Sequence, residues 1–388
     1  MMGGGIVQKG VGALSGGDRI AIECIKRWAR HHEIHVFTGK AGYISHKRYN
    51  VKGVNWHLTS TYISFRDRLI HILLFSIQAL TIGLIKSLLM SGPKGKAIIY
   101  SSDFLPELLP ALILRKRFGS PLICTFYLFA PSPFSQQIFE MSHFLRVLLL
   151  YNMQKFAYIL IRKHADMVFV TNQLDRSRFI DDRRLTPDRV VAVQGGVDTE
   201  APALVPDPPS KYFDAVFIGR LHPQKGIIQL IDIWKKVCSA MPRAKLAVIG
   251  AGQLEEKVKD KIRNLALEDN VVLLGFVDGV EKIGIFKASK IVVHPAIYDS
   301  GGMAACEAMS CGLPGVSFDL PSLKTYYPQG MLKTPRYDFE AFARNIVSLL
   351  TDADLYKKMS KEALELALKW DWNSKAEVIL SQIEKALT

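Results

Sequence analysis

Two carboxylates separated by seven residues stand in the most informative stretch of the chain. Asp299 and Glu307 flank the sequence SGGMAAC, which contains Gly301 and Gly302. Glycines leave backbone amides open to a ligand, and the free amides at the start of a helix carry a partial positive charge that suits a phosphate. Carboxylate oxygens accept hydrogen bonds from hydroxyls. Phosphate on the amides and hydroxyls on the carboxylates would describe a sugar nucleotide.

The elements around these residues are those of a doubly wound sheet. The β-branched run 291–293 predicts a strand covered on both faces, and residues 303–311 predict a helix that stops at Gly312. Asp299 would then lie in the loop at the carboxyl end of a strand, where such sheets bind ligands. Glu307 lies on an apolar helix, where a charge is costly unless it is paired. A simple ion pair with a basic core residue is the plain alternative to a ligand role.

This stretch resembles the motif of two carboxylates seven residues apart in the retaining, nucleotide-sugar-dependent group 1 glycosyltransferases of the GT-B fold. That family usually has Glu-Gly-Phe-Gly where this chain has Asp-Ser-Gly-Gly from Asp299 to Gly302, and it keeps the second carboxylate as Glu307. The resemblance implies an α/β protein with two Rossmann-like domains that face each other across a cleft. Alternating apolar strands and helices in both halves of the chain favour the same architecture.

The resemblance also implies roles for residues of the second half. Arg220 and Lys225 would grip the donor diphosphate, because fixed cations stabilise the charge that a pyrophosphate gathers as it leaves. Glu307 would hold the ribose hydroxyls, and Asp299 the hydroxyls of the transferred sugar. The remaining donor-binding positions would act through their backbone, at the diphosphate or the nucleobase, and are Gly219, Phe276, Val277, Gly301, Gly302 and Met303. For Lys225 the alternative is a solvated loop lysine.

The first half resembles the family less closely. Gly17, in the pair Gly16-Gly17, would approach the donor diphosphate or the acceptor. Tyr127 stands where family members often carry a histidine, so it could hydrogen-bond a sugar hydroxyl but could not shuttle a proton as imidazole does. A packed core tyrosine is the alternative. The opening glycines are spaced GxGxxxG, with Ile6-Val7 as a poor leading strand, which does not match the dinucleotide fingerprint.

We therefore expect three segments. Residues 1–200 would form the acceptor-binding domain and 201–369 the nucleotide-sugar-binding domain, while 370–388 would form a helix that crosses back to the first domain. The boundary is placed at the proline-rich segment 199–211. Following the family, the acceptor would attack from the front face, with the leaving phosphate taking its proton. We find no DxD-like metal motif at a useful place, so we expect metal independence and no cofactor.

Charge is concentrated in the first half of the 388-residue chain. Residues 1–200 hold 26 Lys and Arg against 14 Asp and Glu, within a formal net charge of +14. This favours an anionic partner, and with no nucleic-acid motif we expect peripheral contact with an anionic membrane; a merely soluble basic domain is the alternative. The apolar run 69–90 is interpreted as a core or interfacial helix. Five scattered cysteines and no apolar leader favour a cytoplasmic protein, at the inner face of the cell membrane.

The sequence thus predicts a retaining hexosyltransferase of glycan biosynthesis. It would move a sugar from a UDP- or GDP-sugar to a glycan, glycolipid or polyprenyl-linked acceptor. Two alternatives stay open. A sugar-nucleotide 2-epimerase shares the fold and the donor but needs no acceptor, and a non-catalytic subunit would bind the nucleotide sugar without transferring it.

Overall fold

The computed structural model describes residues 16–61, 69–130, 132–134, 144–181 and 185–385. Contacts divide the chain into two units. The first unit comprises Met1–Val193 and Ala376–Thr388, and the second comprises Gln194–Lys375. Each unit contains parallel strands that alternate with helices, which is the α/β architecture predicted from the sequence.

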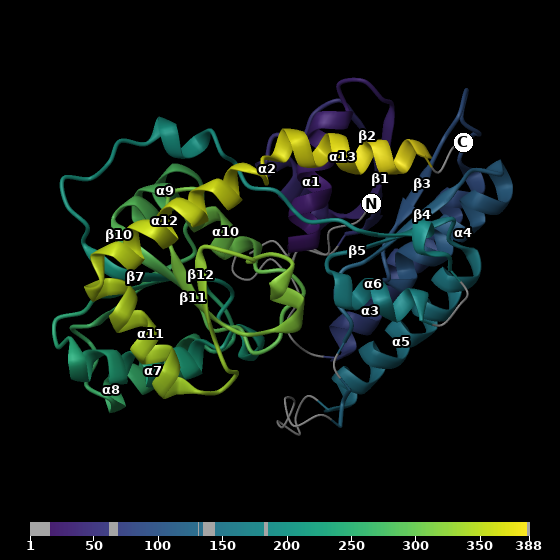
Figure 1. The fold of residues 1–388 in the computed structure, drawn as a ribbon. Coiled ribbons are helices and arrows are strands. Elements are labelled where there is room, and N and C mark those ends of the chain that lie inside the picture. Colours follow the sequence, from purple (N-terminus) through teal and green to yellow (C-terminus); the bar gives the residue numbers. More distant parts are fainter. Residues whose placement is uncertain (1–15, 62–68, 131, 135–143, 182–184, 386–388) are drawn as a thin grey trace. The chain divides into compact units, whose positions relative to one another are not determined.

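The second unit is built on one six-stranded parallel sheet. Its strands are short apolar runs. Successive side chains of a strand point to opposite faces of the sheet, and both faces of this sheet are buried, so every position favours an apolar residue. The strand order is β12-β11-β10-β7-β8-β9, and Figure 1 labels β7, β10, β11 and β12 of this sheet. The strands are β7 (Phe213–Ile218), β8 (Leu246–Ile249), β9 (Val271–Gly275), β10 (Ser289–His294), β11 (Gly315–Phe318) and β12 (Met331–Thr334).

Helices cover both faces of this sheet, and each face has its own core. On one face Phe217 and Val248 pack with side chains of three helices, α7 (Ile227–Ala240), α8 (Glu255–Asn264) and α11 (Phe339–Thr351). On the other face Val216 and Ala247 pack with those of α9 (Gly279–Lys287), α10 (Met303–Met309) and α12 (Ala353–Leu368). Neighbouring residues of one strand therefore contribute to opposite cores, as expected for a doubly wound sheet.

The first unit has a four-stranded parallel sheet and a separate parallel pair. The sheet order is β3-β4-β5-β6, and β1 pairs with β2. Its strands are β1 (Ile34–Gly39), β2 (Val54–Ser60), β3 (Ile99–Ser101), β4 (Leu122–Phe126), β5 (Met167–Val170) and β6 (Val190–Ala192). Its helices are α1 (Gly16–Trp28), α2 (Lys40–Arg48), α3 (Leu69–Leu89), α4 (Leu105–Phe118), α5 (Phe144–His164) and α6 (Gln173–Ile180).

The last helix, α13 (Trp372–Lys385), begins in the second unit and from Ala376 onward belongs to the first. Within the first unit the indole nitrogen of Trp28 donates to the carbonyl of Ala376 at 3.1 Å. The chain passes between units at Val193 and Gln194, a few residues before the predicted boundary at 200. The proline-rich segment 199–211 therefore belongs to the second unit.

Two sequence-based expectations concern helices and strands near the amino terminus. The leading strand at Ile6-Val7 and the first glycines fall outside the described residues. The apolar run 69–90 is largely α3. Of the helices the structure describes, none combines the length and apolar character that a membrane span requires.

Candidate active site

The loops that carry the predicted site residues leave neighbouring strands at the same edge of the sheet. β7 and β10 are parallel partners, with Ala215 opposite Ile291 and Val216 opposite Val292. The strand order reverses between them, because β8 and β9 continue on the side of β7 while β11 and β12 continue on the side of β10. Such a reversal is where doubly wound sheets bind ligands, beyond the carboxyl ends of the strands.

The loops after β7 and β10 meet through a buried ion pair. The ammonium of Lys225 lies 2.5 Å from Oδ2 of Asp299, and the two side chains are only 19% and 9% exposed. Burial pushes the pKa of Asp299 upward, but the charge of Lys225 and the contact with His294 outweigh it and hold that pKa well below its usual range. The carboxylate is therefore ionised. This burial excludes the alternative that Lys225 is a loop lysine in solvent.

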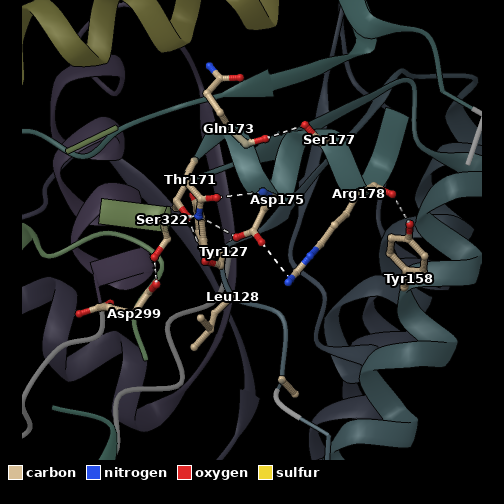
Figure 2. Close-up of polar contacts among 12 residues, drawn as sticks. Tyr127, Leu128, Tyr158, Thr171, Gln173, Asp175, Ser177, Arg178, Asp299 and Ser322 are labelled. Carbon is tan, nitrogen blue, oxygen red and sulfur yellow. Dashed lines mark hydrogen bonds and ion pairs between the residues drawn. The ribbon is translucent and has the colours of Figure 1, made fainter. Parts of the chain in front are cut away.

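The carboxylate of Asp299 is oriented by its own loop. Its Oδ1 accepts hydrogen bonds from the backbone amides of Ser300 at 2.9 Å and Gly301 at 3.4 Å. Ser322 also donates its hydroxyl to the carbonyl of Asp299, as Figure 2 shows. The two backbone amides hold Oδ1, and Oδ2 therefore faces Lys225. The carboxylate of Asp299 thus has one defined orientation.

His294 is a buried neighbour of Asp299 that sequence reasoning missed. Its Nε2 lies 3.4 Å from Oδ2 of Asp299, and its side chain is 4% exposed. Burial lowers the pKa of His294, although the carboxylate opposes that effect. A neutral imidazole beside an ionised carboxylate is the state that this environment favours at neutral pH. The sequence signal that could have identified His294 is its position as the last residue of β10, directly before Pro295.

Two tyrosines explain why Gly301 and Gly302 carry no side chains. A Cβ on Gly301 would lie 2.6 Å from the ring of Tyr326, and one on Gly302 would lie 2.3 Å from the hydroxyl of Tyr327. Tyr327 also donates its hydroxyl to the carbonyl of Gly302. The glycines thus let the chain run tightly against these rings where α10 begins. Met303 follows, with its thioether packed against Gly195.

Glu307 on α10 has a basic partner, and it is less buried than its apolar surroundings suggest. Its side chain is 24% exposed, and Oε2 lies 2.9 Å from the ammonium of Lys282 on α9. Asp278 holds the same ammonium at 2.8 Å. The ion pair that we considered as the plain alternative therefore exists. Its lysine comes from a helix that the sequence analysis did not identify.

The other predicted residues of the second unit are distributed around these loops. Arg220 is half-buried, two residues after the end of β7, and within the part of the chain that the structure describes its guanidinium forms no ion pair. Gly219 lies between the ring of Phe217 and the stem of Lys225. Phe276 and Val277 follow β9, with Val277 buried in the core that α10 shares. The structure thus joins Lys225 with Asp299 directly, and Glu307 with neither of them.

In the first unit the structure brings Gly17 and Tyr127 together. A Cβ on Gly17 would lie 2.6 Å from the ring of Tyr127, so the start of α1 packs flat against that ring. The Tyr127 hydroxyl lies 3.1 Å from that of Tyr100, and burial raises the pKa of Tyr127. Thr171 donates to the backbone carbonyl of Tyr127 at 3.1 Å (Figure 2). Tyr127 is therefore a packed, neutral hydroxyl at the end of β4.

The side chains of the site do not include a recognisable set of metal ligands among the described residues: no group of three or more His, Cys, Asp or Glu side chains is arranged to hold a metal ion. The loops supply the cations Arg220 and Lys225 and, beside Lys225, the carboxylate of Asp299. The two cations suit an anionic ligand directly.

Comparison with known proteins places the second unit in a family. Residues 205–366 match the model of the glycosyl transferases group 1. The chain is 30% identical over 166 residues to the poly(glycerol-phosphate) alpha-glucosyltransferase of Bacillus subtilis, covering 42% of this chain and 24% of that one. It is 26% identical over 244 residues to the D-inositol 3-phosphate glycosyltransferase of Corynebacterium efficiens, covering 58% of each. The chain thus spans between a quarter and three fifths of these relatives' lengths.

Solved structures extend the likeness of fold to both units. Anabaena HepE, solved in complex with UDP-glucose, matches with a TM-score of 0.71 at 17% identity over 98% of both chains. The sucrose-phosphate synthase of Thermosynechococcus elongatus matches with a TM-score of 0.71 at 17% identity, covering 99% of this chain and 95% of that one. The predicted GT-B fold is therefore confirmed, and residues 205–366 match the predicted family, the group 1 glycosyl transferases.

Proposed function

We propose that this protein transfers a hexose from a nucleoside diphosphate sugar to an acceptor hydroxyl with retention of anomeric configuration. The observation that carries the proposal is the Lys225–Asp299 pair at the strand-order reversal of a group 1 glycosyltransferase domain. A cation beside a sugar-binding carboxylate is the combination that a charged leaving group and a hexose require. HepE was solved with UDP-glucose, which supports a UDP-sugar ahead of a GDP-sugar.

The proposed roles follow the positions of the groups. Lys225 and Arg220 hold the diphosphate, with Gly219 allowing the chain to approach it. The backbone at Gly301, Gly302 and Met303 assists them. Asp299 binds hydroxyls of the hexose and Glu307 those of the ribose. The corner at Phe276 and Val277, where β9 ends, receives the base. In the first unit Gly17 and Tyr127 serve the acceptor side.

The reaction needs no redox partner. The bond between the anomeric carbon and the β-phosphate oxygen breaks, and a bond to the acceptor oxygen forms on the same face of the sugar. The acceptor proton passes to the departing diphosphate. Lys225 and Arg220 stabilise the growing negative charge, which is the task that a divalent cation performs in metal-dependent enzymes. We therefore propose a metal-independent transfer that EDTA leaves unchanged.

Activity measurements with purified protein test this proposal. UDP- and GDP-sugars are first screened by thermal shift, and turnover is then followed as release of the nucleotide with and without a lipid or glycan extract. Lys225→Met should lower kcat/KM for the donor by about 100-fold or more, the scale of losing one transition-state contact. Glu307→Ala should lower it by at least about tenfold, the value of its ribose contact. Lys261→Met removes a lysine–carboxylate pair between α8 and Asp232 on α7 and should be neutral.

Several outcomes would contradict the proposal. Full activity in both site variants would remove the site assignment, whereas donor binding without transfer to any acceptor would favour a non-catalytic subunit. Nucleotide release that does not depend on acceptor would favour the epimerase. The folded state of each variant is checked by its thermal transition, because Lys225→Met leaves the buried Asp299 without its cation.

We propose that the first unit, which would bind the acceptor, also binds the cytoplasmic face of an anionic membrane. On α3 the side chains of Ile70, Leu74, Ile77, Ile85 and Leu88 are 44–61% exposed, and their spacing places them on one helix face. On α5 Phe156 and Ile159 are about half exposed beside the exposed Lys155 and Lys163. Both helices pack against α4. Exposed apolar side chains beside lysines are the composition of an interfacial surface.

A further inference from the structure

Lys282 is a buried cation to which the proposed reaction assigns no role. It lies on α9, and its side chain is only 13% exposed. An ammonium so far removed from water is costly unless it is paired. Burial alone would lower the pKa of Lys282, but the charges of Glu307 and Asp278 raise it well above its ordinary value. The lysine therefore remains charged and remains bound to both carboxylates.

The geometry of this group fixes one oxygen of Glu307 and leaves the other open. Lys282 occupies Oε2 at 2.9 Å, and Asp278 holds the same ammonium at 2.8 Å. Among the described residues Oε1 has no hydrogen-bond partner, and the Glu307 side chain is 24% exposed. A carboxylate has about four acceptor positions, so the open oxygen can accept further hydrogen bonds.

The contact also restricts how the Glu307 side chain turns. Glu307 belongs to α10 and Lys282 to α9, so the ion pair joins two separate elements. A glutamate side chain that rotates freely would lose entropy each time it captured a ligand. Because the partner ammonium is itself anchored by Asp278, the carboxylate is held before the ligand arrives.

We propose that Lys282 is a positioning residue that holds Glu307 so that its open oxygen accepts the ribose hydroxyls of the nucleoside diphosphate. The inference rests on the proposed function and deepens it, because it assigns the preference for ribose to a residue that does not touch the ribose. Loss of Lys282 removes this preference, while the diphosphate contacts of Lys225 and Arg220 persist.

Calorimetric titration with two probes tests the inference. UDP and 2′,3′-dideoxy-UDP are titrated into the wild type, Lys282→Met and the matched control Lys261→Met; if the screen favours guanine, GDP and its dideoxy form replace them. The wild type and Lys261→Met should bind the ribose form at least about tenfold more tightly, the value of one hydrogen bond to a charged acceptor. In Lys282→Met the ratio should fall to about threefold or less.

Further variants separate positioning from folding. Asp278→Asn keeps an amide oxygen that accepts from Lys282, so the ammonium stays on Glu307 and the tenfold ratio should persist even if the thermal midpoint falls. Glu307→Gln should lower the ratio as Lys282→Met does, and the double variant should lose no more than either alone, because both act through one contact. Lys282→Gln replaces Lys282→Met if the latter does not fold.

The outcomes distinguish this inference from the proposed function. Equal weakening of both probes in Lys282→Met, with the tenfold ratio intact, overturns the positioning role and leaves the enzyme assignment standing. A wild type that binds no nucleoside diphosphate overturns the proposed function and this inference with it. A lower ratio in Lys282→Met with an unchanged ratio in Lys261→Met supports both.

Discussion

At the scale of single residues, the pairing of Lys225 with Asp299 sets the charge of the site before any donor arrives. Each side chain neutralises the other across 2.5 Å, so the pair is stable although both groups are largely buried. A diphosphate would compete with Asp299 for the lysine, whose ammonium has three donors and can serve both. In the proposed function, His294 and the loop amides would keep Asp299 oriented for a sugar hydroxyl while the lysine also holds the diphosphate.

The ion pair gives the protein a defined response to acid. Because the pKa of Asp299 is lowered on folding, the stability it contributes is present above the unfolded-state value of about 4 and is lost as pH falls below it. Asp299→Asn should lower the free energy of unfolding at pH 7 by about 1–3 kcal/mol. Chemical denaturation should show that the difference in the free energy of unfolding between this variant and the wild type shrinks between pH 5 and pH 3.

A matched control comes from an exposed pair. Asp260, on α8, pairs with Arg263, and both side chains are more than half exposed. Asp260→Asn should therefore change the free energy of unfolding by less than about 1 kcal/mol. A difference for Asp299→Asn that stayed constant from pH 7 to pH 3 would mean that folding does not lower the pKa of Asp299.

The sequence indicated the chemical types at the site better than their partners. Asp299 and Lys225 each stood out because of neighbouring glycines and apolar strands, yet they are far apart in the chain and only the strand order joins them. Lys282 gave no signal, because a lone lysine in a short helix is ordinary. Glu307 looked fully buried from its apolar neighbours, whereas its place on α10 leaves it partly exposed.

At the scale of elements, the close approach of two loops depends on one glycine. Gly226 has φ +68°, and a Cβ there would lie 1.9 Å from the carbonyl oxygen of Pro295. The backbone amide of Ile297 also donates to the carbonyl of Gln224 at 3.1 Å. The loop after β7 is thus locked to the loop after β10, and this contact sets the separation of Lys225 and Asp299.

A pair of glycine variants separates backbone strain from this contact. Gly279 has φ +63°, but a Cβ there would meet nothing within 4 Å. Gly279→Ala should cost about 1–2 kcal/mol of unfolding free energy, the strain of a left-handed alanine. Gly226→Ala should cost at least about 1 kcal/mol more, because the backbone of Pro295 must move, and it should also raise the donor KM.

The free energy of unfolding and the donor KM of the two glycine variants test whether Gly226 sets the separation of the loops. Denaturation gives the two stability losses, and steady-state kinetics gives the donor KM of each variant. Equal losses for the two alanines, with an unchanged KM in both, would show that the loops tolerate a wider separation and that Gly226 serves conformation alone.

Element prediction from the sequence succeeded where a strand was uniformly apolar. The central strand β10 was identified from its β-branched run 291–293, because both of its faces are buried. β2 and β12 were missed, since β2 contains polar side chains and pairs with β1 alone, and β12 is a four-residue edge strand. Edge strands bury less surface and so leave a weaker pattern.

At the scale of the whole molecule, charge and exposed apolar surface coincide in the first half of the chain. Of the net charge of +14, residues 1–200 supply 26 cations against 14 acids. The apolar faces of α3 and α5 belong to the same unit. An anionic bilayer offers attraction of about 1 kcal/mol for each nearby cation and an apolar layer for the exposed side chains. The two contributions respond differently to salt and to mutation.

Vesicle flotation distinguishes these contributions. The wild type should float with phosphatidylserine-containing vesicles at low salt, and the bound fraction should fall in high salt or with neutral phosphatidylcholine, because screening removes the long-range attraction. Ile77→Glu combined with Leu88→Glu places two charges on the exposed face of α3 and should lower binding at least tenfold at low salt. Leu204→Glu, at an 81% exposed position of the second unit, should have no such effect. Binding that survived the double substitution, or that Leu204→Glu reduced equally, would show that general charge attraction holds the protein at the membrane and that α3 does not insert.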